Sequence, residues 1–241
     1  MTVSLGAKAG MVAVPQSRRK RGSLSTGEIV MASLRVLDTE GPAALTFNRL
    51  GRELRSSPTA VYRHYSSRQE ILLAVAEHLD FLSLDNYSPT DDWRNDLTQL
   101  AWRAWDVANL HPAAASVAMG LITNGVHELS AVEAVLRAIS AAGLRGRQAV
   151  IHYQVYANLV LGAAMAQGRR LSDLQFAESN DFLQVYSPSD PAKWPHAEAL
   201  KDDLRVVDYV EVFRRQVEMY LDALGLAVDR QKETEATKRA S

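Results

Sequence analysis

Cysteine is absent from the 241-residue chain. The sequence can therefore form neither a disulfide framework nor a cysteine-ligated zinc site, and it offers no thiol nucleophile. No segment is as continuously apolar as the roughly 20 residues that cross a bilayer, and the first residues lack the apolar core of a secretion signal. These absences favour a cytoplasmic protein that does not enter a membrane.

Motifs of the common enzyme classes are also missing. His127–Glu128 is not followed by the second histidine of a zinc-protease motif, and no two histidines stand four residues apart. The chain has no phosphate-binding loop, no dinucleotide-binding glycine motif and no G-x-S-x-G sequence. We therefore expect no enzymatic activity, no metal site and no cofactor.

The formal net charge of −1 conceals an uneven distribution. Between Arg18 and Arg68 there are ten Lys and Arg residues against four Asp and Glu residues, so the remainder of the chain is acidic overall. A basic module joined to an acidic body suits a protein that meets a polyanion with one end only. A basic tail followed by a solvated helix face would give the same count, so charge alone leaves both interpretations open.

The stretch 45–68, LTFNRLGRELRSSPTAVYRHYSSR, predicts two short helices separated by a tight polar turn. Thr46 can cap the first helix, on which Leu50 and Leu54 form an apolar stripe. Ser57 followed by Pro58 is a strong start signal for the second, because proline lacks a donor that would be unpaired at that position. Two helices across so small a turn indicate a helix-turn-helix, whose second helix can enter a DNA major groove.

The remaining pattern is helical, and no strand pattern occurs, so we predict an all-α fold with about nine or ten helices. Residues 1–23 are expected to be a flexible basic arm, 24–68 the helix-turn-helix module, 69–225 a larger helical domain and 226–241 a disordered tail. The expected helices cover about 24–40, 46–54, 58–65, 68–84, 92–110, 112–120, 126–142, 147–167 and 198–224, with a long loop at 168–194 and Gly225 ending the last helix.

The order of these elements resembles the tetracycline-repressor (TetR) family of bacterial transcriptional regulators, from about residue 24 to 224. The resemblance is most specific at SPTAVYRHY, residues 57–65, followed by Ser67–Arg68. Within the larger domain it is carried by Trp93-x-x-x-Leu97, by Ala-Ala-Gly-Leu at 141–144 and by Leu-Gly-Ala at 161–163.

The resemblance implies a ligand-responsive repressor that binds a palindromic operator as a homodimer, with residues 147–167 and 202–224 forming the dimer interface. It also implies ten DNA-contacting residues: Thr46, Asn48, Arg49, Ser57, Pro58, Thr59, Tyr62, Arg63, His64 and Arg68. Tyr62 could instead be a core tyrosine, His64 a cap on its own helix, and Arg68 an exposed arginine without function.

Two residues depart from the family pattern. Arg55 stands where the family usually has glycine, at a position expected to need positive φ, and Ser56 replaces an apolar residue of the turn. We expect either a different turn geometry or some strain at Arg55, and looser packing at Ser56.

For the effector, we expect an apolar, aromatic-lined cavity suited to a small lipophilic or flat aromatic molecule. Leu84 falls where the tetracycline repressor has a ligand-binding histidine, so tetracycline itself is not expected. Ordinary core packing is the alternative role for each of the candidate lining residues, which are Trp102, Trp105, Met119, His127, His152, Tyr153, Tyr156 and Met165. A helical scaffold that binds only proteins remains the alternative function, and weak, salt-insensitive DNA binding would identify it.

Overall fold

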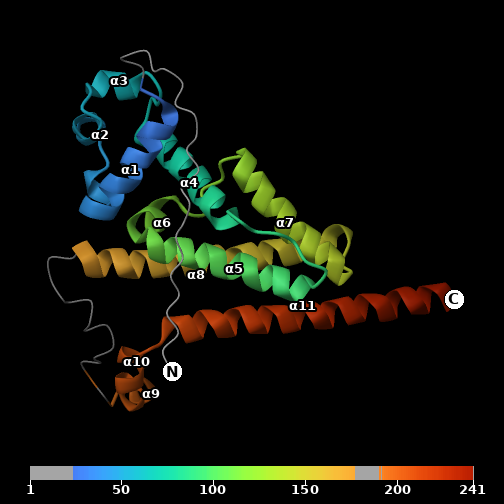
Figure 1. Ribbon diagram of the computed structural model, residues 1–241. Helices are drawn as coiled ribbons and strands as arrows, with labels where there is room; N and C mark the ends of the chain where they lie inside the picture. The colour runs from blue at the N-terminus through green and yellow to red at the C-terminus, as the bar shows by residue number, and fades with distance from the viewer. Residues whose placement is uncertain (1–23, 177–189, 191, 241) are drawn as a thin grey trace, which may run out of the picture.

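The computed structural model describes residues 24–176, 190 and 192–240, and these residues form helices and no strand. A small group of three helices lies at one end of a body of longer helices, and the fourth helix runs from one part into the other (Figure 1). The all-α prediction and the placing of a small helical module before a larger helical body are therefore confirmed.

The small module begins and ends its helices at local signals. Ser25 and Glu28 form a complete capping box, and Gly41 at φ 80° ends the first helix. The apolar face of that helix is buried, with Ile29 and Leu37 fully covered. The elements of the module are α1 (Thr26–Glu40), the short 3₁₀ helix η1 (Pro42–Ala44), α2 (Phe47–Glu53) and α3 (Pro58–Tyr62).

Glycine at position 51 sets the distance between α2 and α3. A Cβ there would lie 3.0 Å from the backbone nitrogen of Pro58 and 3.1 Å from the carbonyl oxygen of Ser56. The Gly51 carbonyl in turn accepts a hydrogen bond from the Ser56 N–H at 2.8 Å. The turn between the two helices is therefore closed over a residue without a side chain.

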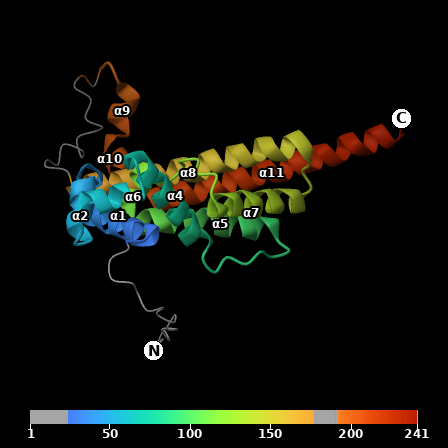
Figure 2. The same ribbon diagram turned by 90° about the horizontal axis from the view of Figure 1, so that it is seen from above.

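The body packs its helices around a second core, which includes Leu97, Trp105 and Phe213. Helices α8 and α11 run alongside each other in both views, and α11 extends beyond the rest of the body (Figure 2). The helices are α4 (Arg68–Leu84), α5 (Trp93–Leu110), α6 (Pro112–Ala118), α7 (Val126–Ala142), α8 (Gly146–Phe176), α9 (Pro195–Ala199), α10 (Lys201–Arg205) and α11 (Tyr209–Ala240).

The prediction that a loop begins at residue 168 is wrong, because α8 continues to Phe176. Tertiary contacts with the small module explain the extension. The side chain of Gln175 donates to the Asp38 carbonyl at 2.9 Å, and the Phe176 ring lies against Gly41. Residues 177–189 of the expected loop, like the basic arm 1–23, lie outside the described residues.

The bounds expected for the last helix are also wrong. Residues 195–205 form the separate helices α9 and α10, and Asp208 caps a new helix by accepting from the Val210 N–H at 2.9 Å. This helix, α11, passes through Gly225 and reaches Ala240, where a disordered tail was expected. Val228 is buried in the body core and keeps the helix packed beyond the glycine.

Candidate nucleic-acid interface and internal cavity

The helix-turn-helix predicted from residues 45–68 is present. Thr46 caps α2 by accepting from the Arg49 N–H at 3.2 Å, and Ser57 caps α3 by accepting from the Ala60 N–H at 3.3 Å. Val61 faces the core and is fully buried, whereas Thr59 on α3 and the two residues that follow Tyr62, Arg63 and His64, are exposed. These exposed side chains can donate to phosphates or base edges.

Tyr62 is neither a core residue nor a free one. Its ring stacks on Phe47 of α2 with the centroids 3.8 Å apart and an angle of 1° between the planes. The side chain nevertheless remains 54% exposed, so the stack fixes the ring and leaves it accessible from solvent. Such a fixed, exposed phenol is suited to donate a hydrogen bond to an external acceptor.

Arg55 lies in the turn at φ 50°, as the comparison with the family's glycine predicted. A residue with a Cβ is disfavoured in this left-handed region, which costs about 1 kcal/mol. Its side chain is exposed, so the position adds positive charge to the turn. For Ser56, looser packing stays a prediction.

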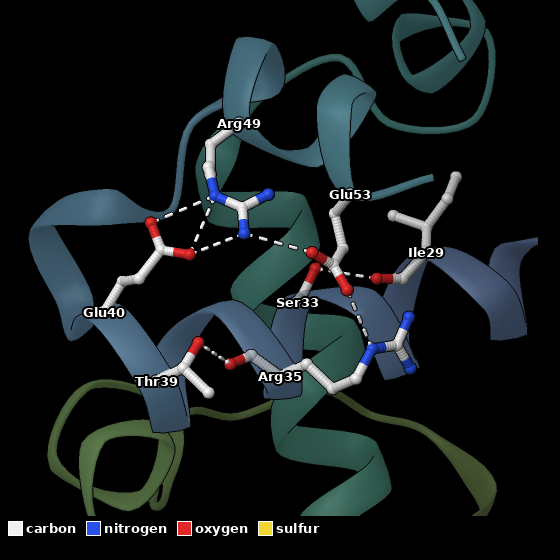
Figure 3. A network of polar contacts seen from close by, with 7 residues as sticks. All are labelled: Ile29, Ser33, Arg35, Thr39, Glu40, Arg49 and Glu53. Atoms are coloured by element: carbon white, nitrogen blue, oxygen red, sulfur yellow. Dashed lines mark hydrogen bonds and ion pairs between the residues drawn. The ribbon is translucent and has the colours of Figure 1, made fainter. Parts of the chain in front are cut away.

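Arg49 is held inside the module by carboxylates (Figure 3). Its guanidinium bridges Glu40 at the end of α1, at 2.5 Å, and Glu53 of α2, at 3.0 Å, and Glu53 also pairs with Arg35 at 3.0 Å. The hydrogen bond from Arg49 lowers the pKa of Glu40, and those from Arg35 and then Arg49 lower the pKa of Glu53. These pairs join α1 to α2, so the guanidinium of Arg49 is already occupied within the protein.

Arg68, at the first turn of α4, is exposed, and its guanidinium donates to the Pro42 carbonyl at 3.0 Å. That bond positions the arginine over η1 and leaves donors of its five N–H groups available. Asn48 is exposed on α2, and Pro58 at the start of α3 is half-buried. Contact with DNA stays a prediction for all ten residues.

A cavity of about 390 Å³ lies within the body and is lined by parts of α4, α5, α7 and α8 and by the segment between α6 and α7. Three of the eight residues proposed from the sequence line it, namely Met119, Tyr153 and Tyr156. The Tyr156 hydroxyl donates to the Leu97 carbonyl at 2.6 Å, which fixes this ring as a wall of the cavity.

The other five residues proposed from the sequence lie elsewhere. Trp105 stacks on Phe213 at 4.4 Å and lines a separate space of about 190 Å³, while Trp102 meets Phe213 edge-on. His127 packs against Phe81. His152 has a buried Nδ1 with no partner among the described residues, and Met165 is partly exposed beside Gly120.

The polar lining of the cavity was missed by sequence reasoning. It consists of Asp80 and Ser83 from α4, Glu128 from α7, and Gln154 and Asn158 from α8. The spacing of three residues between Asp80 and Ser83, and of four between Gln154 and Asn158, puts each pair on one helix face. The sequence shows this helical spacing, but only the fold shows that both helix faces line the same cavity.

Helix α4 is connected to the far side of the cavity through Glu77. This carboxylate accepts from the backbone N–H groups of His127 at 2.7 Å and Glu128 at 3.3 Å, and from the Thr123 hydroxyl at 2.9 Å. Gly125, at the start of α7, has no side chain to cap that helix, and a Cβ there would collide with the Glu77 carboxyl. Thus α4 supplies the cap of α7.

Helix α8 is the one described helix long and apolar enough to span a membrane by length and composition. A core helix of a soluble protein passes the same test, and α8 packs against α5, α6, α7 and α11. Within the described residues, no three His, Asp or Glu side chains gather in an arrangement that could hold a metal ion.

The fold and these sites define a helix-turn-helix protein whose small module is joined by α4 to a larger helical body with a cavity. The description "Bacterial regulatory proteins, tetR family" matches residues 29–75, and "Tetracyclin repressor-like, C-terminal domain" matches residues 87–228. The chain belongs to the tetracycline-repressor family of bacterial transcriptional regulators.

Three similar proteins illustrate the relationship. An HTH-type transcriptional regulator of Saccharopolyspora erythraea is 29% identical over 153 residues, which cover 63% of this chain and 64% of the relative. The Streptomyces coelicolor protein ActR, in complex with actinorhodin, has a TM-score of 0.70 at 19% identity and covers 86% of this chain and 99% of its own. BioQ with its double-stranded DNA operator has a TM-score of 0.59 at 24% identity, and the match covers 84% of this chain and 98% of the BioQ chain. The two structures show likeness of fold.

Proposed function

We propose that this regulator is a repressor that binds a palindromic operator as a homodimer and is released by a small lipophilic or aromatic effector. The observation that carries the proposal is α4, which begins beside the helix-turn-helix and lines the cavity with Asp80 and Leu84. A ligand that moves α4 changes the position of α3 as well. The BioQ–operator and ActR–actinorhodin complexes support DNA binding and ligand binding as the two activities to test.

The DNA contacts are proposed for the exposed residues of the module. Thr59 on α3 and Arg63 at its C-terminal end would read base edges, and Tyr62 and His64 would hold phosphates. Arg68, with donors left over from its bond to Pro42, would hold a further phosphate at the start of α4. Since Arg49 is paired with two carboxylates, we propose that it orients α2 and contacts the DNA backbone less directly.

The homodimer interface is proposed on the exposed apolar side chains of α8 and α11. A monomer rarely leaves so many large apolar residues uncovered on two adjacent helices. Two α8–α11 pairs would form a four-helix interface and hold the two α3 helices about one DNA turn apart. These exposed residues include Val150, Ile151, Val155 and Met165 of α8, and Val210, Val212, Met219 and Leu226 of α11.

The direct test is selection of binding sites from random DNA by the full-length protein, with the mass of the complex measured by sedimentation. The proposal predicts an enriched palindrome occupied by an even number of chains. A selected site without two-fold symmetry, bound by one chain, would contradict the homodimer, and the absence of enrichment would leave the protein-binding scaffold as the better account.

A further inference from the structure

The cavity in the body has an uneven distribution of polar groups. Its lining includes two carboxylates, Asp80 and Glu128, and no Lys, Arg or His side chain. Most of the remaining lining is aliphatic or aromatic, including Leu100, Val135 and Tyr156. Asp80 and Glu128 are half-buried, and no basic side chain of the lining pairs with them, so this space of about 390 Å³ combines apolar walls with uncompensated negative charge.

The two carboxylates are held differently. Glu128 accepts from the backbone N–H groups of Thr123 at 2.7 Å and Asn124 at 2.6 Å, so its carboxylate is already engaged within the protein. Asp80 forms no hydrogen bond or ion pair with any described residue, although its helix carries it into the cavity. Asp80 is therefore the one carboxylate of the cavity lining that remains available to bind a ligand.

The electrostatic surroundings of Asp80 are uniformly acidic. Burial is the main cause that raises its pKa to about 7, and the charges of Glu128 on α7 and Glu77 on α4 add to the rise. The facing phenol of Tyr153 on α8 has a raised pKa, caused first by its own burial and then by Glu128 and Asp80. No cation compensates this cluster from the cavity wall, so a positive charge placed there would be attracted by all of these groups.

We infer that the cavity takes an amphiphilic effector with an apolar skeleton and an ammonium group, which pairs with Asp80 beside Glu128. The aliphatic and aromatic walls hold the skeleton, and the side chains of Gln154 and Asn158 are placed to hydrogen-bond its polar substituents. This assignment rests on the proposed role of the cavity as the effector site and narrows the effector to cations, whereas aromaticity alone would also admit neutral and anionic molecules.

Binding should depend on pH in a defined direction. A cation pairs with the ionised form of Asp80, which predominates above about pH 7 in the free protein. As pH falls below 7 the carboxyl is protonated before the ligand arrives, and the affinity for the cation decreases. Among the other titratable groups around Asp80, hydrogen bonds hold the pKa of Glu77 below its usual value and burial raises the pKa of the Tyr153 phenol, so neither group changes charge between pH 6 and 8. The remaining groups are Glu128 and His127 of α7 and His78 of α4, whose pKa is lowered by burial.

The test uses full-length protein and three probes that share one skeleton: 1-naphthylmethylamine, 1-naphthalenemethanol and 1-naphthoate, titrated calorimetrically at pH 8. We expect the amine to bind about tenfold more tightly than the alcohol, and the naphthoate more weakly still. In Asp80→Asn the advantage of the amine should fall to about threefold or less, with the alcohol unaffected. The matched control, Asp91→Asn, removes an exposed carboxylate outside the cavity and should leave the preference intact.

A pH series on the unaltered protein keeps the inference testable even where Asp80→Asn folds poorly. The affinity for the amine should fall about tenfold from pH 8 to pH 6, while that for the alcohol stays constant. Equal affinities for amine and alcohol, a preference that survives in Asp80→Asn, or no binding of the amine at millimolar concentration would overturn the inference.

Operator binding, measured by fluorescence anisotropy on the same samples, separates this inference from the proposed function. If the protein binds its selected DNA but shows no preference for the amine, the proposed function stands and the assignment of a cationic effector is wrong. If the protein prefers the amine but shows no sequence-specific DNA binding, the cation site stands and the proposed repressor role is wrong.

Discussion

The carboxylate of Glu77, in the middle of α4, accepts a hydrogen bond at 2.7 Å from the backbone N–H of His127 in the first turn of α7. Burial opposes ionisation of Glu77, but hydrogen bonds from His127, Thr123 and Glu128 outweigh that effect and lower its pKa. Helix α4 therefore cannot slide along α7 without breaking the cap. Because α4 also carries Asp80 into the cavity, its position depends on contacts with both the small module and the cavity wall.

Removing this cap should destabilise the protein. Glu77→Gln keeps the shape of the side chain but loses its charge, so we expect the free energy of unfolding to fall by about 1–2 kcal/mol. Urea denaturation monitored by circular dichroism measures it. Glu133→Gln, at an exposed position on the same α7 helix, is the control and should change stability by less than about 0.5 kcal/mol.

The contribution of Glu77 should also depend on pH. Since its pKa is lowered in the folded state, its stabilising effect is complete above pH 4.5 and is lost as pH falls through the lowered pKa. The difference in unfolding free energy between the unaltered protein and Glu77→Gln should therefore shrink on acidification below 4.5. A difference that grows towards acid pH would contradict the cap.

Gly51 should tolerate no side chain. Gly51→Ala places a Cβ against the backbone of Pro58 and Ser56, so overpacking should lower the unfolding free energy by about 1–3 kcal/mol and misplace α3. Gly27→Ala is the matched control, because a Cβ in the first turn of α1 meets no atom within 4 Å. That change should stabilise by about 0.5–1 kcal/mol. Equal thermal melts for the two variants would show that α2 and α3 are not closely packed at Gly51.

The turn residue Arg55 offers a test of strain. Arg55→Gly relieves a positive φ but adds freedom to the unfolded chain, and we expect a net gain of up to about 1 kcal/mol. Arg52→Gly removes the same charge from the helical backbone of α2, where glycine should cost about 1 kcal/mol. Destabilisation of similar size in both variants would mean that the turn carries no strain.

Tyr62 and Arg63 have different proposed roles in DNA binding, so substituting them should have different effects. Arg63→Ala should relax sequence preference at one base pair, at a cost of about 1–3 kcal/mol for the preferred sequence. Tyr62→Phe keeps the stack on Phe47 but removes the hydroxyl, so it should weaken binding to all sequences alike. Anisotropy titrations with the operator and single-base variants measure both effects, and an equal loss of selectivity in the two proteins would contradict these roles.

Local signals explain why most of the fold could be predicted from the sequence. The capping box of Ser25 and Glu28, the Ser57–Pro58 start and the left-handed Gly143 each act within a few residues, and each begins or ends a helix close to the expected bounds. The helix ends that were predicted wrongly depend on residues distant in the sequence. Phe176 extends α8 by packing at Gly41, and Val228 keeps α11 packed beyond Gly225.

The cavity was less predictable than the helix-turn-helix for the same reason. Aromatic content does not say which side a ring faces, and Trp102 and Trp105 turn towards Phe213 rather than into the cavity. Asp80 looked like one of many scattered acidic residues in the sequence. Only the packing of α4 against α7 brings it beside Glu128 in an apolar space.

The central claim, that the exposed face of α3 reads DNA as part of a symmetric dimer, is tested most directly by titrating the selected operator and a scrambled duplex at increasing salt concentrations. The account predicts tight, sequence-dependent binding whose affinity falls steeply with salt, as expected where several Lys and Arg side chains displace counterions from phosphates. Equal, weak binding to both duplexes at every salt concentration would contradict it.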